Sequence, residues 1–387
     1  MAEKSKKPAI RFAGFTDAWE QRKLGDVAIR ESTTVMSSDK NPSIEYEDVV
    51  SEEGRLNKDI QLKDMQKSGI AFNGSQVLYG KLRPYLHNWL NPNFSGVAVG
   101  DWWVLKPNKI DKNFLYRLIQ TQKFDDVANQ SAGSKMPRAD WNLVSNTIFD
   151  IPYSVDEQSK IAKTFTNIDN LITLHQRKYD KLVNVKKAML EKMFPKDGAD
   201  VPEIRFKGFT EAWEQCKLGE IVGITMGQSP DGATYSETQA DYILIQGNAD
   251  LKDGWVYPRV WTTQKTKTAE AGDLIMSVRA PAGTMGKTSY NAVIGRGVAS
   301  IKGNEFIFQT LNKMDADGYW RKLSAGSTFE SLNSDSIKNA EIMVPTTQEQ
   351  VQIGNIFQKL DNLITLHQRK LKKLKNLKKA CLEKMFV

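Results

Sequence analysis

The 387-residue sequence has few cysteines and no long apolar run. Two cysteines are too few for a disulfide framework. No run approaches the roughly 18 to 20 apolar residues of a membrane span, and neither end carries a lipidation motif. The polar start, MAEKSKKP, does not look like a secretory signal. These absences lead us to expect a cytoplasmic protein with no membrane role.

The composition is otherwise that of a globular protein, with 40% hydrophobic and 26% charged residues, 26 glycines and 13 prolines. The length allows two or three domains. A net charge of +8 favours an acidic partner where the basic residues cluster. Glu157–Phe194 has eight basic and four acidic residues, and Glu349–Phe386 has nine and three. The rest of the chain is nearly neutral, so we expect these two segments to supply non-specific, salt-dependent attraction.

The sequence is a tandem duplication. Ile10–Val27 recurs as Ile204–Ile221 with 13 of 18 positions identical, and Glu157–Phe194 recurs as Glu349–Phe386 with 25 of 38 identical. Both copies of the longer segment contain DNLITLHQRK and end in LEKMF. A repeated frame of this kind predicts two similar structural units. The inserts of about 125 residues inside the frame differ almost completely, which indicates two different ligands.

The two longer repeats are predicted to be long helices, because apolar residues recur at alternating spacings of four and three. At about 1.5 Å per residue, each helix extends on the order of 55 Å. Asp156 and Thr347 are the expected N-terminal caps. The apolar seams, which we expect to pair, contain Ile161, Phe165, Ile168, Ile172 and His175 in the first helix and Ile353, Phe357, Leu360, Ile364 and His367 in the second.

The linker Pro195–Glu203 is short and polar, so the second insert begins near the far end of the first helix. For the two seams to meet, the second helix then has to run back toward the first insert. We therefore predict an antiparallel coiled coil with one domain at each end, related by a pseudo-twofold axis. A symmetric arrangement of this kind suits a symmetric partner or duplex DNA.

Each insert is predicted to be a mixed α/β domain, which makes the fold class α+β. Short β-rich runs are separated by Gly, Asn and Pro turns. These runs are Ser75–Tyr79, Val97–Leu105, Tyr242–Gln246 and Asp273–Val278, and one helix is expected at about Lys112–Asn129. The predicted boundaries are residues 1–155 for the first domain, 156–195 for the first helix, 196–346 for the second domain and 347–387 for the second helix.

Two patterns resemble catalytic motifs, but each has a simpler structural interpretation. Ala282–Tyr290 resembles a phosphate-binding loop, yet Pro281 stands where that pattern requires glycine. Ser289–Asn291 then looks like a strand instead of the helix that should face phosphate, so a glycine-rich hairpin is favoured. Asn91–Phe94 resembles the NPPF motif of amino-methyltransferases, but its third residue differs and no glycine-rich cofactor loop accompanies it. A surface turn is favoured there.

Carboxylate, thiol and histidine positions do not predict a catalytic or metal site. Asp231 and Asp250, with Lys252, fit a loose nuclease pattern that has no counterpart in the first half. Each cysteine is replaced in the other repeat, Cys216 by an arginine and Cys381 by a methionine. The two seam histidines are more simply polar residues that fix helix register than metal ligands. We assign no catalytic residue, metal ligand or cofactor to this chain.

Nucleic acid is the partner that the inserts favour. In an extended strand, alternate positions of LYGKLRPYLHNW would present basic and aromatic side chains, among them His87 and Trp89, on one face. Arg and Lys can bond guanine or hold phosphates, and Asn and Gln suit adenine. For any single position, a solvated loop residue is an equally good interpretation. The candidate DNA contacts are Lys81, Arg83, Tyr85, Lys135 and Arg138 in the first insert and Gln228, Ser229, Gln246, Asn248, Arg279, Lys287 and Ser327 in the second.

The repeated frame resembles the DNA-specificity subunit of type I restriction and modification systems. The resemblance rests on PEIRFKGFTEAWEQCKLGEI, a divergent domain, and a helix with LDNLITLHQRK and LEKMF, and it covers the whole chain. MGQSP and IQGNADL are similar to recognition-domain loops of that family. The resemblance implies a non-catalytic subunit with two target-recognition domains, each reading one half of a split, asymmetric DNA target. The helices would set the gap between the halves and dock methyltransferase subunits.

The resemblance also implies partners and their cofactors. Besides double-stranded DNA, these are two adenine methyltransferase subunits that use S-adenosylmethionine and, in a restricting complex, translocating endonuclease subunits that use ATP and Mg²⁺. Two alternatives stay open at this point. One is a stand-alone bipartite DNA-binding regulator, and the other is a coiled-coil scaffold that makes no DNA contact.

Overall fold

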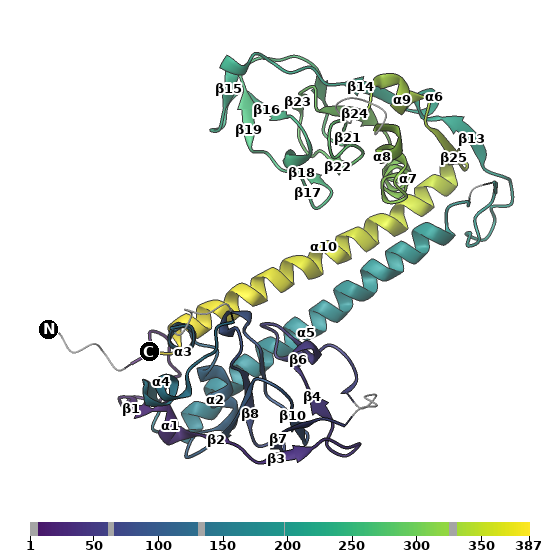
Figure 1. Cartoon of the computed structure of the whole chain (residues 1–387). Helices are drawn as coiled ribbons and strands as arrows, with labels where there is room; N and C mark the ends of the chain where they lie inside the picture. The colour runs from purple at the N-terminus through teal and green to yellow at the C-terminus, as the bar shows by residue number, and fades with distance from the viewer. Residues whose placement is uncertain (1–6, 61–65, 131–135, 197, 325–330) are drawn as a thin grey trace. The chain divides into compact units, whose positions relative to one another are not determined.

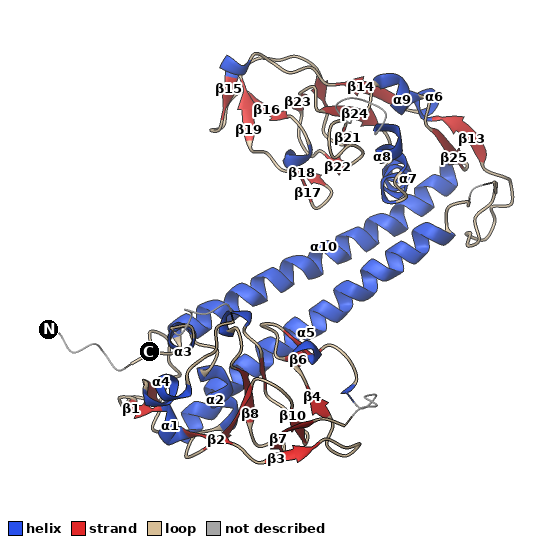
Figure 2. Cartoon of the chain, in the orientation of Figure 1, coloured by secondary structure: helices blue, strands red, loops and turns tan. Residues whose placement is uncertain are grey.

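The computed structural model describes residues 7–60, 66–130, 136–196, 198–324 and 331–387, and the chain divides into two compact units. Unit 1 comprises Met1–His175 and Lys370–Val387, and unit 2 comprises Gln176–Arg369. Each unit therefore contains one insert together with parts of both long helices. The strands and helices of the two units are shown in Figures 1 and 2.

Unit 1 is built from short strands, short helices and the first part of a long helix. Its strands are β1 (Glu20–Lys23), β2 (Ala28–Glu31), β3 (Thr34–Met36), β4 (Ser43–Ile44), β5 (Val49–Val50), β6 (Arg55–Leu56), β7 (Ser68–Phe72), β8 (Val77–Gly80), β9 (Trp89–Leu90), β10 (Gly96–Ala98), β11 (Trp102–Pro107) and β12 (Ile148–Ile151). Its helices are α1 (Leu24–Val27), α2 (Lys112–Leu118), α3 (Gln122–Ala128), α4 (Trp141–Asn146) and the start of α5 (Val155–Lys192), with 3-10 turns η1 (Tyr46–Asp48) and η3 (Pro84–Leu86). The two main sheets have the orders β2-β11-β8-β9 and β3-β7-β10-β4.

Unit 2 follows the same plan, but its two main sheets contain more strands. Its strands are β13 (Glu214–Lys217), β14 (Gly223–Met226), β15 (Tyr235–Ser236), β16 (Tyr242–Ile245), β17 (Leu251–Lys252), β18 (Trp255–Val256), β19 (Val260–Thr262), β20 (Thr268–Ala269), β21 (Leu274–Ser277), β22 (Met285–Lys287), β23 (Ala292–Ile294), β24 (Val298–Lys302) and β25 (Glu341–Val344). Its helices are α6 (Leu218–Ile221), α7 (Glu305–Ala316), α8 (Tyr319–Ser324), α9 (Ser334–Lys338) and the start of α10 (Thr347–Lys384), with 3-10 turns η4 (Gly232–Thr234) and η5 (Asn248–Asp250). The main sheets have the orders β14-β24-β21-β22-β18-β17 and β15-β19-β16-β23-β20.

The two units share one sheet frame although their inserts differ in sequence. Strands β2 and β8 flank β11 antiparallel in unit 1, and β14 and β21 flank β24 in the same way in unit 2. In the other sheet, β10 runs parallel to β4 and antiparallel to β7, as β23 does to β16 and β20. Strands β8 and β21 are buried along their whole length, which explains why their sequences are continuous apolar runs without alternation. Equivalent positions in the two units can therefore be compared.

The repeated motif at the start of each half ties that unit to its long helix. Strand β1 pairs with β12 just before α5, and β13 pairs with β25 just before α10. The Nε and Nη2 atoms of Arg11 donate to Glu157 at 2.6 and 2.8 Å, and those of Arg205 donate to Glu349 at 2.8 and 2.8 Å. Both glutamate side chains are only 1% exposed. Such bidentate, charge-assisted bonds fix both the position and the orientation of the two groups.

The core of unit 1 is completed by the last residues of the chain. Phe386 packs between Trp19, Phe114 and Phe165, with ring centroids 6.3, 5.4 and 6.1 Å away. Met385 is buried in the same cluster. The C-terminus accordingly lies among the elements of unit 1 in Figure 1. This confirms the prediction that the second helix returns to the first domain.

The core of unit 2 contains the equivalent pair from the other repeat. Phe194 packs between Trp213, Phe306 and Phe357, with ring centroids 5.9, 5.5 and 6.0 Å away, and Met193 is buried beside it. The LEKMF sequence that ends each long helix is therefore repeated because each copy fills the core of a different unit. Aromatic rings at these separations, in edge, stacked and tilted orientations, contribute beyond the area that they bury.

Segments of the two long helices run antiparallel inside each unit. Asp169 of α5 lies 2.8 Å from Lys378 of α10 in unit 1, and Asp361 of α10 lies 2.6 Å from Lys186 of α5 in unit 2. In unit 1, the LEKMF end of α10 contacts Phe165 near the start of α5. In unit 2, the LEKMF end of α5 contacts Phe357 near the start of α10. The antiparallel direction is thus observed within each unit, and a coiled coil along the full helix length stays a prediction.

The predicted seam residues are most deeply buried near the domains. Ile161, Phe165, Ile353 and Phe357 are buried in the two cores, and Leu360 packs against the second of them. Ile168 is also buried. The remaining four, Ile172, His175, Ile364 and His367, are half-buried. Burial therefore decreases away from the domain that each helix enters.

Two predicted elements in the first insert are wrong because turns interrupt them. Val97–Leu105 is not one strand, since the chain turns at Gly100, where φ is 94°, and divides it into β10 and β11. The helix expected at Lys112–Asn129 is two helices, α2 and α3. The Oγ1 atom of Thr121 accepts a hydrogen bond from the backbone N–H of Phe124, so this threonine starts a new helix.

The predicted N-terminal caps of the long helices are also wrong. Helix α5 begins at Val155 and α10 at Thr347, so Asp156 and Thr347 both lie in the first turn. In α10, the preceding Thr346 accepts a hydrogen bond at Oγ1 from the N–H of Glu349 at 3.4 Å. Asp156 still favours the helix, because an acidic residue in the first turn interacts well with the helix dipole.

Candidate nucleic-acid interface

The segment that follows β8 does not form the extended strand predicted for it. Strand β8 ends at Gly80, and the chain then forms the 3-10 turn η3 at Pro84–Leu86. Arg83 and His87 on either side of this turn have left-handed backbone conformations, with φ of 49° and 52°. Pro84 favours such a turn because its φ is already fixed and its nitrogen carries no proton. The predicted alternation of basic and aromatic side chains on one face is therefore wrong.

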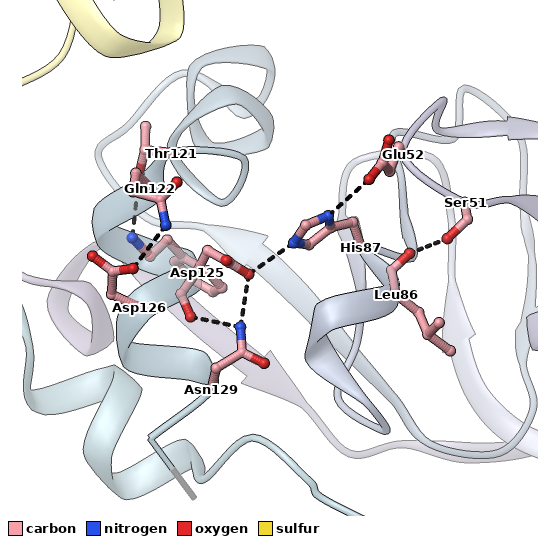
Figure 3. Close-up of polar contacts among 10 residues, drawn as sticks. Ser51, Glu52, Leu86, His87, Thr121, Gln122, Asp125, Asp126 and Asn129 are labelled. Carbon is pink, nitrogen blue, oxygen red and sulfur yellow. Dashed lines mark hydrogen bonds and ion pairs between the residues drawn. The ribbon is translucent and has the colours of Figure 1, made fainter. Parts of the chain in front are cut away.

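Polar contacts of His87 hold this turn on two sides, as Figure 3 shows. The Nδ1 atom lies 3.3 Å from a carboxylate oxygen of Glu52, and Nε2 lies 2.9 Å from one of Asp125. The imidazole ring stacks on Trp89, with ring centroids 5.3 Å apart. His87 and the buried Trp89 are thus structural, while Tyr85 at the turn is 53% exposed.

Lys81 and Arg138 are brought together by an acidic residue that the sequence interpretation did not select. The carboxylate of Asp101 accepts hydrogen bonds from Nε and Nη2 of Arg138 at 3.2 and 3.1 Å, and Nζ of Lys81 lies 3.5 Å away. Partial burial raises the pKa of Asp101, but hydrogen bonds and positive charge from Arg138 and Lys81 outweigh burial and leave that pKa below its ordinary value. The carboxylate is therefore ionised at neutral pH.

Backbone contacts fix the same three segments. Leu82 and Arg138 form an isolated antiparallel bridge, and the N–H of Arg83 donates to the carbonyl of Pro137 at 2.7 Å. The hydroxyl of Tyr46 donates to the carbonyl of Asp101 at 2.9 Å and accepts from the N–H of Leu82 at 2.8 Å. Burial raises the pKa of Tyr46 well above its ordinary value, so the phenol stays protonated. Lys135 lies outside the described residues.

Most candidate residues of unit 2 that the structure describes lie on loops that follow β14, β16 and β21, and Lys287 ends strand β22. Arg279 is exposed and forms an antiparallel bridge with Ser331. Gln228 is exposed, and Ser229 accepts a hydrogen bond at Oγ from the N–H of Arg296 at 3.2 Å. Arg279, Gln228 and Ser229 come from two separate loops, and their contact with DNA stays a prediction. Ser327 lies outside the described residues.

Gln246 and Asn248 belong to a turn that is organised by a buried carboxylate. Asp250 accepts a hydrogen bond from the N–H of Gln246 at 2.7 Å and forms an ion pair with Arg259 at 2.9 Å. Asp48 organises the equivalent turn of unit 1, where it accepts from the N–H of Glu45 and pairs with Lys58. This second duplication is hidden inside inserts that share no obvious sequence.

Lys287 is held inside unit 2 by several contacts. Its Nζ atom lies 2.8 Å from a carboxylate oxygen of Glu305 and above the rings of Trp255 and Phe308, and its side chain is 13% exposed. Three partners of this kind are typical of a structural lysine. A DNA contact from Lys287 stays a prediction, and it would require these partners to be given up.

One motif-like pattern has the structural role that was favoured for it. Ala282–Tyr290 begins in the turn of the antiparallel β21–β22 hairpin, which confirms the hairpin interpretation. Ser289–Asn291 is a loop before β23, so the expected strand there is wrong. Asp231 caps the turn η4 by accepting from the N–H of Ala233. Across the described ranges, no cluster of three or more His, Cys, Asp or Glu could hold a metal ion.

A family model matches both halves of the chain. The model for the type I restriction modification DNA specificity domain matches residues 16–184 and again residues 210–376. The chain belongs to this family. Each match covers one insert and most of the long helix that follows it, so the duplicated sequence corresponds to two recognition domains. The chain is a type I restriction–modification specificity subunit, and the resemblance seen in its sequence is confirmed.

Individual relatives agree with the family. Over 290 residues, the chain is 27% identical to the provisionally named type I restriction enzyme MjaX specificity subunit of Methanocaldococcus jannaschii. The aligned region covers 71% of this chain and 68% of that protein. The chain is 23% identical over 295 residues to the type I restriction enzyme MjaVIII specificity subunit of the same organism, which covers 70% and 69%. Both relatives carry the name of a specificity subunit.

Two solved structures share the fold of this specificity subunit. One is the S subunit of a type I restriction–modification system from M. genitalium, which is 13% identical, has a TM-score of 0.64 and covers 98% of this chain and 99% of that chain. The other comes from work on complex assembly and conformational transition of the type I R-M system. It is 24% identical, has a TM-score of 0.53 and covers 95% and 97%. In the part of this chain that the structure describes, no helix is long and apolar enough to cross a membrane.

Proposed function

We propose that each recognition domain reads one half of a bipartite, asymmetric DNA target and that the two long helices set the distance between the halves. The observation that carries the proposal is one backbone frame with two sets of side chains. Lys81 in unit 1 and Val278 in unit 2 make the same backbone contacts, as do Arg138 and Ser331. Because base sequence is read by side chains at groove edges, unlike side chains on one frame suit two unlike half-sites.

The specificity subunit would act inside a larger complex. Its partners would be double-stranded DNA, two adenine methyltransferase subunits that use S-adenosylmethionine and, where restriction occurs, subunits that translocate and cleave DNA with ATP and Mg²⁺. Flipping of the target adenine would belong to the methyltransferase subunits. This chain would supply recognition and spacing, and no chemical step is assigned to its residues.

An exposed apolar stripe occurs once on each long helix and supports the docking of two identical partners. Leu171 and Leu174 of α5 are 44% and 46% exposed, and the equivalent Leu363 and Leu366 of α10 are 43% and 45% exposed. Residues three apart on a helix lie on the same face. Exposed leucines in a polar surrounding are typical of a protein contact. Because DNLITLHQRK is identical in both helices, the two stripes suit one kind of subunit bound twice.

Exchange of one insert tests the half-site proposal. We would replace residues 222–340 by the corresponding insert of another specificity subunit, express the hybrid with its methyltransferase subunits, and map methylated adenines across the genome. We expect one half of the target to change while the other half and the gap are retained. A change in both halves, or in neither, would contradict the proposal. Cells without the gene provide the background methylation.

The same materials distinguish the two alternatives. A stand-alone regulator would bind its bipartite target as tightly without methyltransferase subunits as with them, which a gel-shift titration at fixed salt would reveal. A scaffold without DNA contact predicts unchanged binding when Lys81, Arg83 or Arg279 is replaced by alanine. Half-site recognition predicts a loss for at least one of these variants.

Charge substitution tests the docking stripes. Leu171→Asp should remove one methyltransferase subunit from the complex, Leu363→Asp should also remove one, and the double variant should remove both. Native mass spectrometry of the assembled complex measures this stoichiometry directly. Val351→Asp is the matched control, since Val351 is 52% exposed on α10 outside the stripe. Full stoichiometry in the double variant would exclude these stripes as the docking sites.

A further inference from the structure

Three backbone segments form a platform in unit 1 at the end of the central strand β8. They are residues 81–83, Asp101 just before β11, and residues 137–139. The N–H of Lys81 donates to the carbonyl of Asp101 at 2.9 Å, and the N–H of Ala139 donates to the carbonyl of Lys81 at 2.8 Å. Lys81 is therefore the middle position of the platform.

Unit 2 contains the same platform at the end of β21. The N–H of Val278 donates to the carbonyl of Gly297 at 2.9 Å, and the N–H of Leu332 donates to the carbonyl of Val278 at 2.9 Å. The bridge between Arg279 and Ser331 repeats the one between the corresponding residues of unit 1. The strand registers agree with this equivalence, since β8 and β21 pair with β11 and β24 in the same way.

The backbone of the platform is constant while its side chains are exchanged. The equivalent positions, with the unit 1 residue first, are Lys81 and Val278, Leu82 and Arg279, Asp101 and Gly297, and Arg138 and Ser331. Unit 1 thus carries an acid between two cations, whereas unit 2 carries one arginine between small or apolar residues. Such exchange on a fixed backbone is expected where two domains of one fold recognise different partners.

The acid of unit 1 is less exposed than the cation that it contacts. The backbone carbonyl of Asp101 accepts from both Lys81 and the hydroxyl of Tyr46, and its side chain is 25% exposed. The Arg138 side chain is 52% exposed and contacts both carboxylate oxygens of Asp101 through one edge of its guanidinium. Arginine loses less conformational freedom on binding when its planar fork is oriented in advance.

We propose that Asp101 is a positioning residue that orients Arg138 for bidentate recognition of one guanine in the half-site read by unit 1. The proposal rests on the proposed function and adds to it the residue pair and the kind of base. A guanine presents O6 and N7 in the major groove, and arginine bound to both is the commonest base-specific contact. The exposed part of the Arg138 side chain would make this contact. Lys81 would hold the same carboxylate from the other side.

The test uses the specificity subunit assembled with its methyltransferase subunits. After the wild-type target is mapped by its methylated adenines, methylation rates are measured on a panel of duplexes that carry every single-base change in both half-sites. Arg138→Lys removes the bidentate fork and keeps the charge, and Asp101→Asn keeps the shape and removes the charge. Arg55→Lys is the matched control, since Arg55 forms an ion pair with Glu53 outside the platform.

We expect Arg138→Lys to lose about 10-fold or more of the preference for guanine at one position of one half-site. Asp101→Asn should lose preference at the same position. The double variant should be no worse than Arg138→Lys alone, because Asp101 acts through the arginine. Preferences at all other positions, and those of the Arg55→Lys control, should be unchanged.

Three results would overturn the proposal. An equal loss on every duplex would indicate that Arg138 contacts a phosphate. Additive losses in the double variant would show that the two residues act independently. Unchanged preference would show that neither residue takes part in base recognition. Thermal unfolding of each variant identifies a folding defect, and the exposed Arg138 side chain makes Arg138→Lys the variant least affected by one. Failure of the proposed function is distinct, since the wild-type complex itself would then show no half-site preference.

Discussion

Truncation of Phe386, almost at the end of the chain, should destabilise the domain at its beginning. The Phe386 ring is 8% exposed and contacts Trp19, Phe114 and Phe165 in the core of unit 1. Phe→Ala substitutions in protein cores cost about 3–5 kcal/mol. Because the ring is slightly exposed, we expect the low end of this range, about 3 kcal/mol, for Phe386→Ala, which is about 150-fold in the unfolding equilibrium.

The assay for this prediction has to report on the two units separately. Native-state hydrogen exchange does so, because amides of each unit exchange with the stability of their own cooperative segment. In Phe386→Ala, protection should fall for the strands of unit 1 and stay the same for those of unit 2. The reciprocal variant, Phe194→Ala, should reduce protection in unit 2.

A control and a refuting result complete the design. Val387→Ala changes the neighbouring residue, which is 39% exposed, and should alter stability by no more than about 0.5 kcal/mol. Loss of protection in unit 2 on truncation of Phe386, or no loss in either unit, would refute the idea that each LEKMF sequence completes the core of one particular unit.

Three further predictions concern single side chains. Arg11→Ala leaves the buried carboxylate of Glu157 without its bidentate partner and should cost about 3–5 kcal/mol in urea unfolding, whereas Lys163→Ala on the exposed side of the same helix should cost less than about 0.5 kcal/mol. Equal costs would show that the ion pair does not stabilise unit 1. The pKa of Asp101 is lowered in the folded state, so its contribution is present above the ordinary pKa of 3.8 and is lost as pH falls through the folded pKa. Melting temperatures of wild type and Asp101→Asn should therefore differ at pH 6, and the difference should shrink as pH falls below 3.8. A constant difference would contradict this. Thr121→Ala removes the cap of α3 and should cost about 1–2 kcal/mol, with fraying confined to that helix by hydrogen exchange.

The entry of each long helix into the core of the other unit could be predicted because the duplication exposes it directly. Two copies of LEKMF, two long helices and a short linker require antiparallel helices, and Phe194 and Phe386 occupy the two cores as that arrangement demands. Glu157 and Glu349 recur for an equally local reason, since each receives an arginine from the repeated N-terminal motif.

The finer features could not be predicted, because they depend on backbone contacts that leave little trace in side-chain patterns. Arg83 and His87 adopt left-handed backbone conformations. Residues other than glycine adopt these conformations uncommonly, so the sequence gives no sign of them. The equivalence of Asp48 and Asp250 rests on bonds to backbone N–H groups, which any neighbouring residue can supply. Asp101 was overlooked because a single acid in a nearly neutral insert has no pattern of its own. Its position beside two cations emerges only from the sheet register.

The end of each long helix packs in the core of the other unit, and this affects the order in which the two units can fold during synthesis. Protein domains usually fold in the order of synthesis, the N-terminal one first. Here the rings that complete unit 2, including Phe194, are all synthesised before residue 370, whereas unit 1 lacks Phe386 until the end of the second long helix has been made. The N-terminal domain therefore completes its core last, and a chain released early would contain a finished second domain and an unfinished first one. Both domains can then have complete cores only after Phe386 has been synthesised.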